Sequence, residues 1–359
     1  MEQQLIQLQN GLKKIKDKES KIYFLTQDTA GNASASVAVT YQYVKYLREE
    51  GYDASILYEK KDYKGVDDWL SKEYVDLPHS NIEEGQLKVG PADIVIVPEV
   101  YGHVLEQTMN MPCTKIVFSQ SYDYILETLN PGFGWINYGV TKCITTTEEQ
   151  KEYIKKLFPT VETTVITPSI PDYFKPSEKP KKPLIAVHTR DPRDTMKVIK
   201  SFYLQNPQFK WVTFRDMRNL SREEFAKTLG ESCVSVWVDR ISSFGTFPIE
   251  SMMCESPVIG ALPVMKPKWL SNENGVWVFD EGQLVEIIST FMKNWLEDAV
   301  PENLYSKMKE TIAEFSEEKE RTSVISYFDS LLKEKLTELE TAINKLTPVE
   351  QATPIGEKS

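Results

Sequence analysis

One segment of the chain, residues 236–260, combines small residues, a proline and a carboxylate in a pattern that suits a phosphorylated ligand. An apolar run ends at Asp239, a turn rich in serine and glycine follows, and Pro248 opens a predicted helix. Small residues let the backbone approach a ligand closely, and free N–H groups at a helix start favour anions or hydroxyl oxygens. Glu250 falls in the first helical turn, where a carboxylate accepts hydrogen bonds from two ribose hydroxyls. The candidate binding residues here are Ser242, Ser243, Phe244, Gly245, Thr246 and Glu250. The alternative interpretation is that Glu250 only stabilises the helix start.

A second cluster, residues 185–200, gathers positive charge after another apolar run. That run ends at His188, Arg190 follows in the turn, and Asp191 caps a predicted helix. Arg193 and Lys197 share one face of this helix. A leaving diphosphate gains negative charge as its bond to the transferred group breaks, so fixed cations stabilise the transition state more than the ground state. Arg190, Arg193 and Lys197 are therefore candidate catalytic residues, although a basic helix of this kind is also typical of a solvated surface.

Both clusters follow short apolar runs that alternate with helical patterns along the chain. This alternation predicts parallel sheets covered by helices on both faces. The predicted strands cover residues 21–26, 54–58, 93–97, 115–118, 142–145, 184–187, 211–214, 234–238, 258–260 and 276–279. Ligands of such sheets bind at the carboxyl ends of the strands, where both clusters fall.

The domain organisation follows from a proline-rich stretch and from the length of 359 residues. We predict a first domain over residues 1–168, a linker over 169–183 and a second domain over 184–300. Helices then run over 301–346, with one apolar stripe that is expected to pack on the protein's own domains or, alternatively, on a partner copy. Residues 347–359 are expected to form a disordered tail.

Composition narrows the possible functions. A formal net charge of -11 argues against a general polyanion binder. The four cysteines are widely spaced and form no zinc motif, so no metal site or cofactor is expected. No segment is apolar enough for a signal peptide or a membrane span, which indicates a cytoplasmic protein. The motifs of P-loop nucleotide hydrolases, serine esterases and zinc proteases are absent from the sequence.

The first of these segments resembles the donor-site signature of the GT-B glycosyltransferases, particularly the retaining family 4, in which two glutamates are separated by seven residues. Phe244, Gly245, Pro248, Glu250 and the run Pro257–Ile259 fit this pattern. Ser242 stands where the first glutamate is usual, and Glu255 stands where a glycine is usual. The resemblance implies two Rossmann-like parallel-sheet domains facing a central cleft, with C-terminal helices. It also implies that Glu250 contacts the ribose and that Arg190, with Arg193 or Lys197, holds the diphosphate.

The same resemblance, together with strand positions, suggests residues of the first domain. Gly31 and Asn32 lie in a loop where such enzymes face the donor phosphates. Tyr122 and Asp123 follow one predicted strand, and His103 follows another, so all three are expected on the acceptor side of the cleft. His103 is a candidate for orienting an acceptor hydroxyl, with a purely structural role as the alternative.

The function expected from these features is transfer of a sugar from a nucleotide-diphosphate sugar, with UDP or GDP as the nucleotide. The resemblance implies a retaining reaction, and the sequence has no Asp-x-Asp at a strand end, which favours a metal-independent one. The acceptor is left open among a glycan, a lipid-linked sugar, a protein, a small molecule and a modified DNA base. Two alternatives stay open: a non-catalytic nucleotide-binding or scaffold protein, and a nucleotide-sugar epimerase. The C-terminal helices also allow a homo-oligomer.

Overall fold

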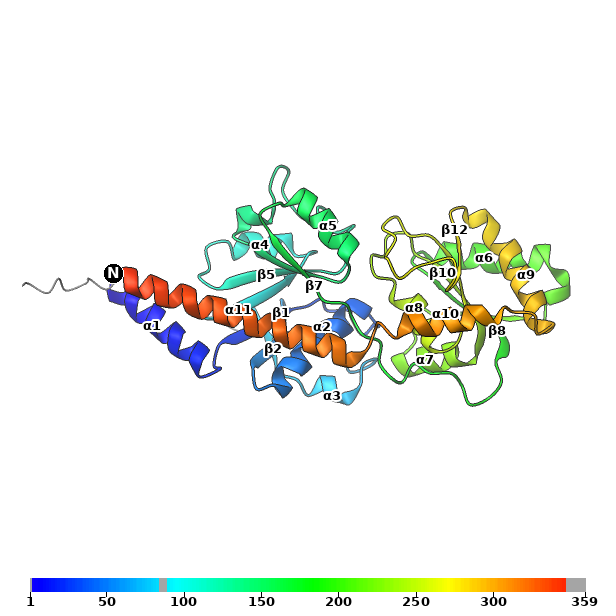
Figure 1. The fold of residues 1–359 in the computed structure, drawn as a ribbon, viewed down its shortest axis with the longest axis horizontal. Coiled ribbons are helices and arrows are strands. Elements are labelled where there is room, and N and C mark those ends of the chain that lie inside the picture. The colour runs from blue at the N-terminus through cyan, green and yellow to red at the C-terminus, as the bar shows by residue number, and fades with distance from the viewer. Residues whose placement is uncertain (1, 84–88, 347–359) are drawn as a thin grey trace, which may run out of the picture.

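The computed structural model describes residues 2–83 and 89–346, which form two domains, each built on a parallel sheet (Figure 1). The sheet of the first domain has seven strands in the order β3-β2-β1-β4-β5-β6-β7. These strands are β1 Lys21–Leu25, β2 Asp53–Tyr58, β3 His79–Asn81, β4 Ile94–Pro98, β5 Thr114–Ser119, β6 Lys142–Thr145 and β7 Glu162–Val165. The predicted two-domain parallel architecture is confirmed.

The sheet of the second domain has five strands in the order β12-β11-β10-β8-β9. They are β8 Lys182–Thr189, β9 Thr213–Asp216, β10 Ser232–Val238, β11 Val258–Ala261 and β12 Val276–Val278. All seven residues of β10 are buried, because this strand is central in the sheet and has helices over both faces.

Helices cover both faces of each sheet. In the first domain they are α1 Glu2–Lys16, α2 Ala35–Glu49, α3 Lys72–Val75, α4 Gly102–Gln107 and α5 Glu148–Leu157. In the second domain they are α6 Pro192–Gln205, α7 Arg222–Glu231, α8 Thr246–Met253, α9 Leu284–Leu296 and α10 Glu302–Ile312. Short 3₁₀ helices are η1 Trp135–Tyr138, η2 Pro207–Phe209 and η3 Glu281–Gln283. In the second domain α6 and α9 share one core on one face of the sheet, whereas α7, α8 and α10 share another.

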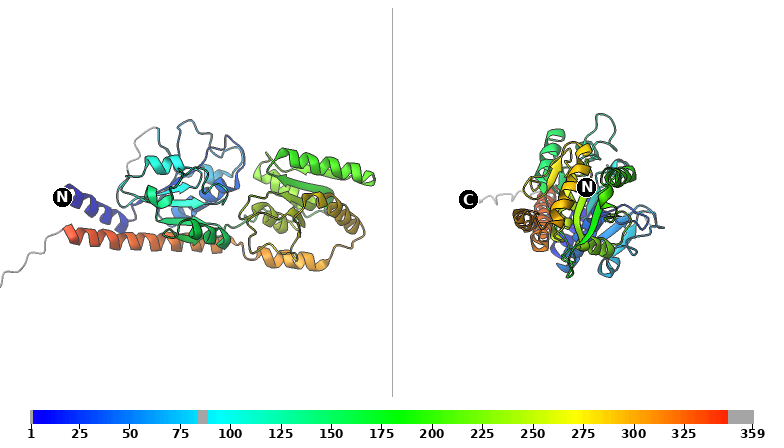
Figure 2. Two further views of the ribbon diagram at one scale, coloured as in Figure 1. Left: turned by 90° about the horizontal axis from the view of Figure 1, so that it is seen from above. Right: turned by 90° about the vertical axis from the view of Figure 1, so that its right-hand side faces the viewer.

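The last helix, α11 (Glu317–Leu346), returns to the first domain and runs along it (Figure 2). Val324 and Phe328 are fully buried in the first-domain core, and the Phe328 ring lies 5.8 Å from that of Phe24 on β1. The apolar stripe predicted from the sequence therefore packs on the protein's own domain.

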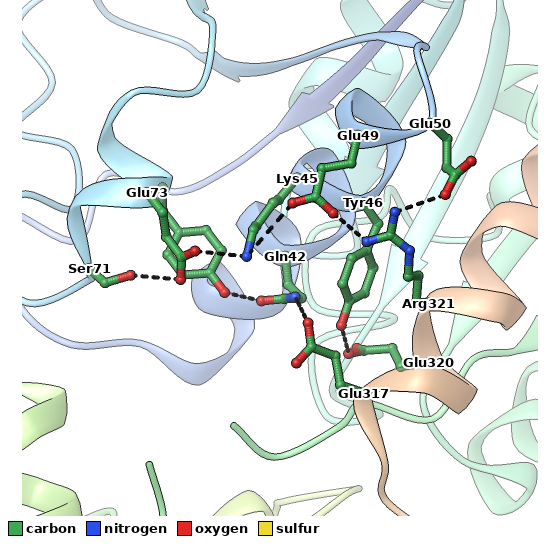
Figure 3. Close-up of polar contacts among 11 residues, drawn as sticks. Gln42, Lys45, Tyr46, Glu49, Glu50, Ser71, Glu73, Glu317, Glu320 and Arg321 are labelled. Carbon is green, nitrogen blue, oxygen red and sulfur yellow. Dashed lines mark hydrogen bonds and ion pairs between the residues drawn. The ribbon is translucent and has the colours of Figure 1, made fainter. Parts of the chain in front are cut away.

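Polar contacts fix the start of α11 to α2 (Figure 3). The Tyr46 hydroxyl donates to Glu320 Oε2 at 3.1 Å, and Ser169 donates to the same oxygen at 2.6 Å. Arg321 forms ion pairs with Glu49 and Glu50 at the end of α2. Ser169 belongs to residues 166–181, which contain no helix or strand and carry the chain into the second sheet. Glu320 therefore links the two connections between the domains, which are residues 166–181 and the start of α11.

The helix α1 and the strands β3 and β7 are among the elements that were not predicted from the sequence. Residues 2–16 form α1, which packs on α11, and Lys16 pairs with Glu340 at 3.4 Å. The strands β3 and β7 lie at the two edges of their sheet and are only partly buried, so neither shows the apolar run of a central strand. The predicted tail, residues 347–359, lies outside the described residues.

Candidate active site

A cleft of about 860 Å³ lies between the two domains, at the carboxyl ends of strands from both sheets. The first domain contributes the ends of β1 and β4, the start of α2 and the loop after β5. The second domain contributes the ends of β8 and β10, the loop before α8, and α8 itself as far as Glu250. This is the edge at which ligands of parallel sheets bind.

Arg190 lines this cleft from the end of β8. Because β8 pairs with β10, the residues that follow the two strands are neighbours, and Arg190 meets Asp239. Its Nε and Nη2 donate to the two carboxylate oxygens of Asp239 at 3.0 and 3.1 Å, and Nη1 donates to the Tyr124 hydroxyl of the other domain at 3.0 Å. A guanidinium carries about five N–H donors, so some remain for a ligand, and the side chain is 46% exposed.

The loop before α8 is held in a conformation that requires glycine. Gly245 has φ +76°, and a Cβ there would lie 2.9 Å from Trp269 Cζ2. Ser242 Oγ accepts the Gly245 N–H at 3.1 Å. Ser243 Oγ accepts the backbone N–H of Tyr122 at 2.9 Å, which joins this loop to the first domain. Ser242, Ser243, Phe244, Gly245 and Thr246 all line the cleft, as does the start of the helix they precede.

Glu250 lies in α8 and lines the same cleft, although only 2% of it is exposed. Arg222, at the start of α7, donates to Glu250 Oε1 at 2.6 Å. The guanidinium of Arg222 also lies 4.8 Å from the Phe174 ring centroid and 5.6 Å from that of Phe225. Because the pair is largely buried, removing either side chain would leave the other charge buried without its partner.

Two arginines of the cleft were not predicted from the sequence. Arg222 lines it, and so does Arg218, whose Nε donates to Asp216 Oδ1 at 2.9 Å. Both follow β9, so a search for cations after every strand of the second domain would have found them. The pairing of Arg222 with Glu250 depends on the packing of α7 against α8, which no local pattern reveals.

His188 lines the cleft at the end of β8 and is neutral at physiological pH. Its ring stacks on Phe247, with centroids 4.9 Å apart. The pKa of His188 is lowered to about 4, mainly by burial; the nearby Arg190 and Arg218 act in the same direction, and Asp239 and Asp216 oppose them. Its Nδ1 atom is buried without a partner in the described residues.

Glu99 lines the cleft from the first domain, directly after β4. Its Oε1 atom accepts the backbone N–H groups of Gln120 and Ser121 at 3.1 and 2.7 Å. Burial raises the pKa of Glu99 to about 7, although both backbone bonds act in the opposite direction. The carboxyl group therefore changes charge near neutral pH.

The structure places three of the proposed catalytic residues outside the cleft. Arg193 and Lys197 project from α6, with side chains 83% and 73% exposed. Each pairs with a neighbour on its own helix or cap: Arg193 Nε lies 2.9 Å from Asp191 Oδ2, and Lys197 Nζ lies 2.7 Å from Asp194 Oδ1. His103 is half-exposed, and its Nε2 lies 2.6 Å from Glu59 Oε1.

The remaining first-domain candidates border the cleft without lining it. Gly31, with φ +84°, and Asn32 lie in a loop between Gln27 and Ala33, which both line the cleft. Tyr122 reaches the second domain through its backbone N–H, and Asp123 is exposed.

Two further properties concern metals and membranes. Within residues 2–83 and 89–346, no three His, Cys, Asp or Glu side chains gather in a way that could hold a metal ion. None of the helices in this part of the chain has the length and apolar character needed to cross a membrane.

Comparison with known proteins places the chain among GT-B folds. No family model matches the sequence. The chain is 26% identical over 233 residues to an alpha-1,6-glucosyltransferase of Actinobacillus pleuropneumoniae serotype 7 (strain AP76), an alignment that covers 62% of this chain and 67% of the relative.

Solved structures resemble the chain over most of its length. Sucrose-phosphate synthase from Thermosynechococcus elongatus aligns with a TM-score of 0.62 at 14% identity, over 88% of this chain and 99% of the other. Anabaena HepE in complex with UDP-glucose aligns with a TM-score of 0.62 at 13% identity, over 86% and 99%. The pneumococcal O-GlcNAc transferase GtfA, in complex with UDP and GlcNAc, gives 0.59 at 12% identity, over 88% and 99%. The chain therefore has the GT-B fold, with the cleft described above between its two domains.

Proposed function

We propose that this protein is a glycosyltransferase that moves a sugar from a nucleoside-diphosphate sugar to an acceptor hydroxyl. The observation that carries the proposal is that Arg190, the glycine-containing loop before α8 and Glu250 line one cleft between two parallel-sheet domains. The GT-B fold and the glucosyltransferase relative support it.

Three arginines of the second domain provide the positive charge that the diphosphate requires. Arg190, Arg218 and Arg222 line the cleft, and we assign the diphosphate to Arg190 with Arg218 as the second cation. Arg218 takes the place of Arg193 and Lys197, which lie outside the cleft. As the bond from the anomeric carbon to the diphosphate oxygen breaks, its electron pair moves to the diphosphate, and these fixed charges stabilise it.

Glu250 is proposed to bind the ribose, with Arg222 holding and orienting the buried carboxylate. The acceptor oxygen attacks the anomeric carbon on the face that the diphosphate leaves, and the departing diphosphate takes the acceptor proton. This retaining course comes from the resemblance to family 4. We propose that the arginines suffice for the leaving group without a bound metal ion.

UDP-glucose is the first donor to test. The Actinobacillus pleuropneumoniae relative is named a glucosyltransferase, and the solved HepE complex contains UDP-glucose. These names support glucose as the sugar and uridine as the base. The cleft volume of about 860 Å³ is large enough for a nucleotide sugar together with part of an acceptor.

The test is a panel of UDP-, GDP- and dTDP-sugars, with release of the nucleoside diphosphate and formation of product measured with and without EDTA. We expect turnover of at least one donor, unchanged by EDTA, with the anomeric configuration retained. Binding of UDP without turnover would favour the non-catalytic alternative, since Ser242 replaces the first glutamate of the signature. Conversion of the donor sugar without an acceptor would favour the epimerase.

A further inference from the structure

The two walls of the cleft carry different charge. The second-domain wall contains three arginines, Arg190, Arg218 and Arg222, and two carboxylates, Asp239 and Glu250. The first-domain wall contains no Lys, Arg or His among the described residues that line it, and it carries two carboxylates, Glu99 and Glu127. All cationic side chains that line the described cleft therefore lie on the donor side.

Glu99 is fixed in place by two loop N–H groups that use only one of its oxygens. Both loop N–H groups that hold it, from Gln120 and Ser121, donate to Oε1. Gln120 is itself held, because its Nε2 donates to the Ser36 carbonyl at 3.0 Å. Glu99 is 4% exposed and lines the cleft, so Oε2 is the oxygen that is free of the loop bonds. A carboxylate oxygen in this position accepts a hydrogen bond from a hydroxyl.

The rest of this wall is built from neutral polar groups. Ser34, Ser36 and Thr128 line the cleft on this side. The hydroxyls of Ser121 and Thr146, which also line it, are buried with no hydrogen-bond partner in the part of the chain that the structure describes. Buried hydroxyls without partners are costly, and a ligand rich in hydroxyl groups satisfies them.

We propose that the acceptor is a neutral sugar, bound against the first-domain wall with one of its hydroxyls on Glu99, and that this wall excludes acceptors carrying phosphate. This inference rests on the proposed glycosyl transfer and names its acceptor class. A phosphate needs cations or several N–H donors, and here it would face two carboxylates instead. Sugar hydroxyls both donate and accept, which matches a wall of carboxylate, hydroxyl and amide groups. The two carboxylates repel a phosphorylated acceptor, so the selectivity for a neutral sugar comes from this repulsion as much as from the hydrogen bonds to the sugar.

The test compares acceptors that differ in charge at one position, with the donor that supports turnover, at pH 8, where Glu99 is ionised. Methyl α-glucoside is paired with glucose 1-phosphate, and 6-O-methylglucose with glucose 6-phosphate, so that each pair blocks the same hydroxyl. We expect transfer to at least one neutral sugar, with kcat/KM at least about 100-fold above that of its phosphorylated partner.

Variants connect this selectivity to the wall. The double variant Glu99→Gln with Glu127→Gln keeps hydrogen-bonding groups and removes both charges, so we expect the ratio to fall to about 10-fold or less. The control Glu106→Gln removes an exposed carboxylate of α4 that does not line the cleft, and the ratio should stay unchanged. UDP affinity, measured on every variant, reports on folding and on the donor side.

Three results would overturn the acceptor inference: equal or faster transfer to a phosphorylated sugar, donor turnover that no neutral sugar increases, or transfer only to hydroxyl-containing peptides. An unchanged ratio in the double variant would also contradict it. Failure to bind any nucleotide is a different result, because it removes the proposed glycosyl transfer and is measured separately.

Discussion

At the scale of single residues, the ion pair between Arg222 and Glu250 connects the stability of the second domain to its proposed ligand site. Glu250 is 2% exposed, and its only cationic partner among the described residues is Arg222. The pair also joins α7 to α8, because each residue comes from one of these helices. Burying one charge without the other is far more costly than burying neither.

We expect Arg222→Ala to lower the free energy of unfolding by about 3 kcal/mol, because Glu250 is left buried and unpaired. The double variant Arg222→Met with Glu250→Leu should recover at least half of this loss in urea denaturation, since it removes both charges. Nucleotide binding should be weaker than in the wild type in both the single and the double variant. An Arg222→Ala variant as stable as the wild type would contradict this account of the pair.

At the scale of elements, the turn before α8 is the part of the site most sensitive to backbone substitution. Gly245 has φ +76°, a backbone angle that residues other than glycine rarely adopt. Two tryptophans also occupy the space that a Cβ would need. Trp237 and Trp269 therefore fix the position of the helix start that faces the cleft.

We expect Gly245→Ala to cost about 2 kcal/mol of stability and to weaken UDP binding, because the added Cβ would lie 2.9 Å from Trp269 Cζ2 and the turn must shift. Gly51→Ala is the matched control. Gly51 also has positive φ, +85°, but a Cβ there would meet nothing within 4 Å. It should show a loss of about 1 kcal/mol with unchanged UDP affinity. Equal effects of the two substitutions on UDP binding would contradict the proposed role of the turn.

The start of α11 contains a carboxyl group that makes stability depend on pH. Burial raises the pKa of Glu320 from 4.5 to about 7, against the hydrogen bonds from Ser169 and Tyr46. Its Oε1 is buried with no partner in the described residues. The native protein holds a proton that the unfolded chain releases above about pH 4.5, so this group makes stability fall as pH rises from 4.5 to 7.

Glu320→Gln should remove this fall. We expect the stability of the variant, relative to the wild type, to increase by up to about 3 kcal/mol between pH 5 and 8 in urea denaturation. Glu318→Gln, an exposed position on the same helix that is not among the groups acting on Glu320, should give a curve parallel to the wild type. Parallel curves for Glu320→Gln as well would show that the carboxyl is ionised throughout this range.

At the scale of the whole molecule, the two-domain architecture could be predicted because it depends on a repeated local pattern. Ten of the strands were predicted from their apolar runs, and the stripe on α11 indicated which helix face would be covered. The edge strands β3 and β7 could not be predicted in this way because they are only partly buried and lack an apolar run. The helix α1 could not be predicted because its partner, α11, is distant in the sequence.

The same reasoning applies to the candidate site. Arg190 and Glu250, which line the cleft, were predicted as site residues because strand ends and helix starts mark the ligand side of a parallel sheet. Arg193 and Lys197 were expected there because helical spacing puts them on one face, but it does not say which way that face points. The role of Arg222 and the charge difference between the cleft walls depend on how the domains and helices pack, which appears only in three dimensions.

The central claim is that the cleft binds a nucleoside diphosphate through Arg190, and calorimetric titration with UDP tests it most directly. We expect binding to the wild type, at least about 30-fold weaker binding to Arg190→Ala because a charge-assisted contact is lost, and unchanged binding to Arg48→Ala. Arg48 is a suitable control because it forms an ion pair with Asp53 and is 39% exposed, close to the 46% of Arg190, but lies outside the cleft. No binding of UDP, GDP or dTDP to the wild type, or equal UDP affinity in Arg190→Ala, would contradict the claim.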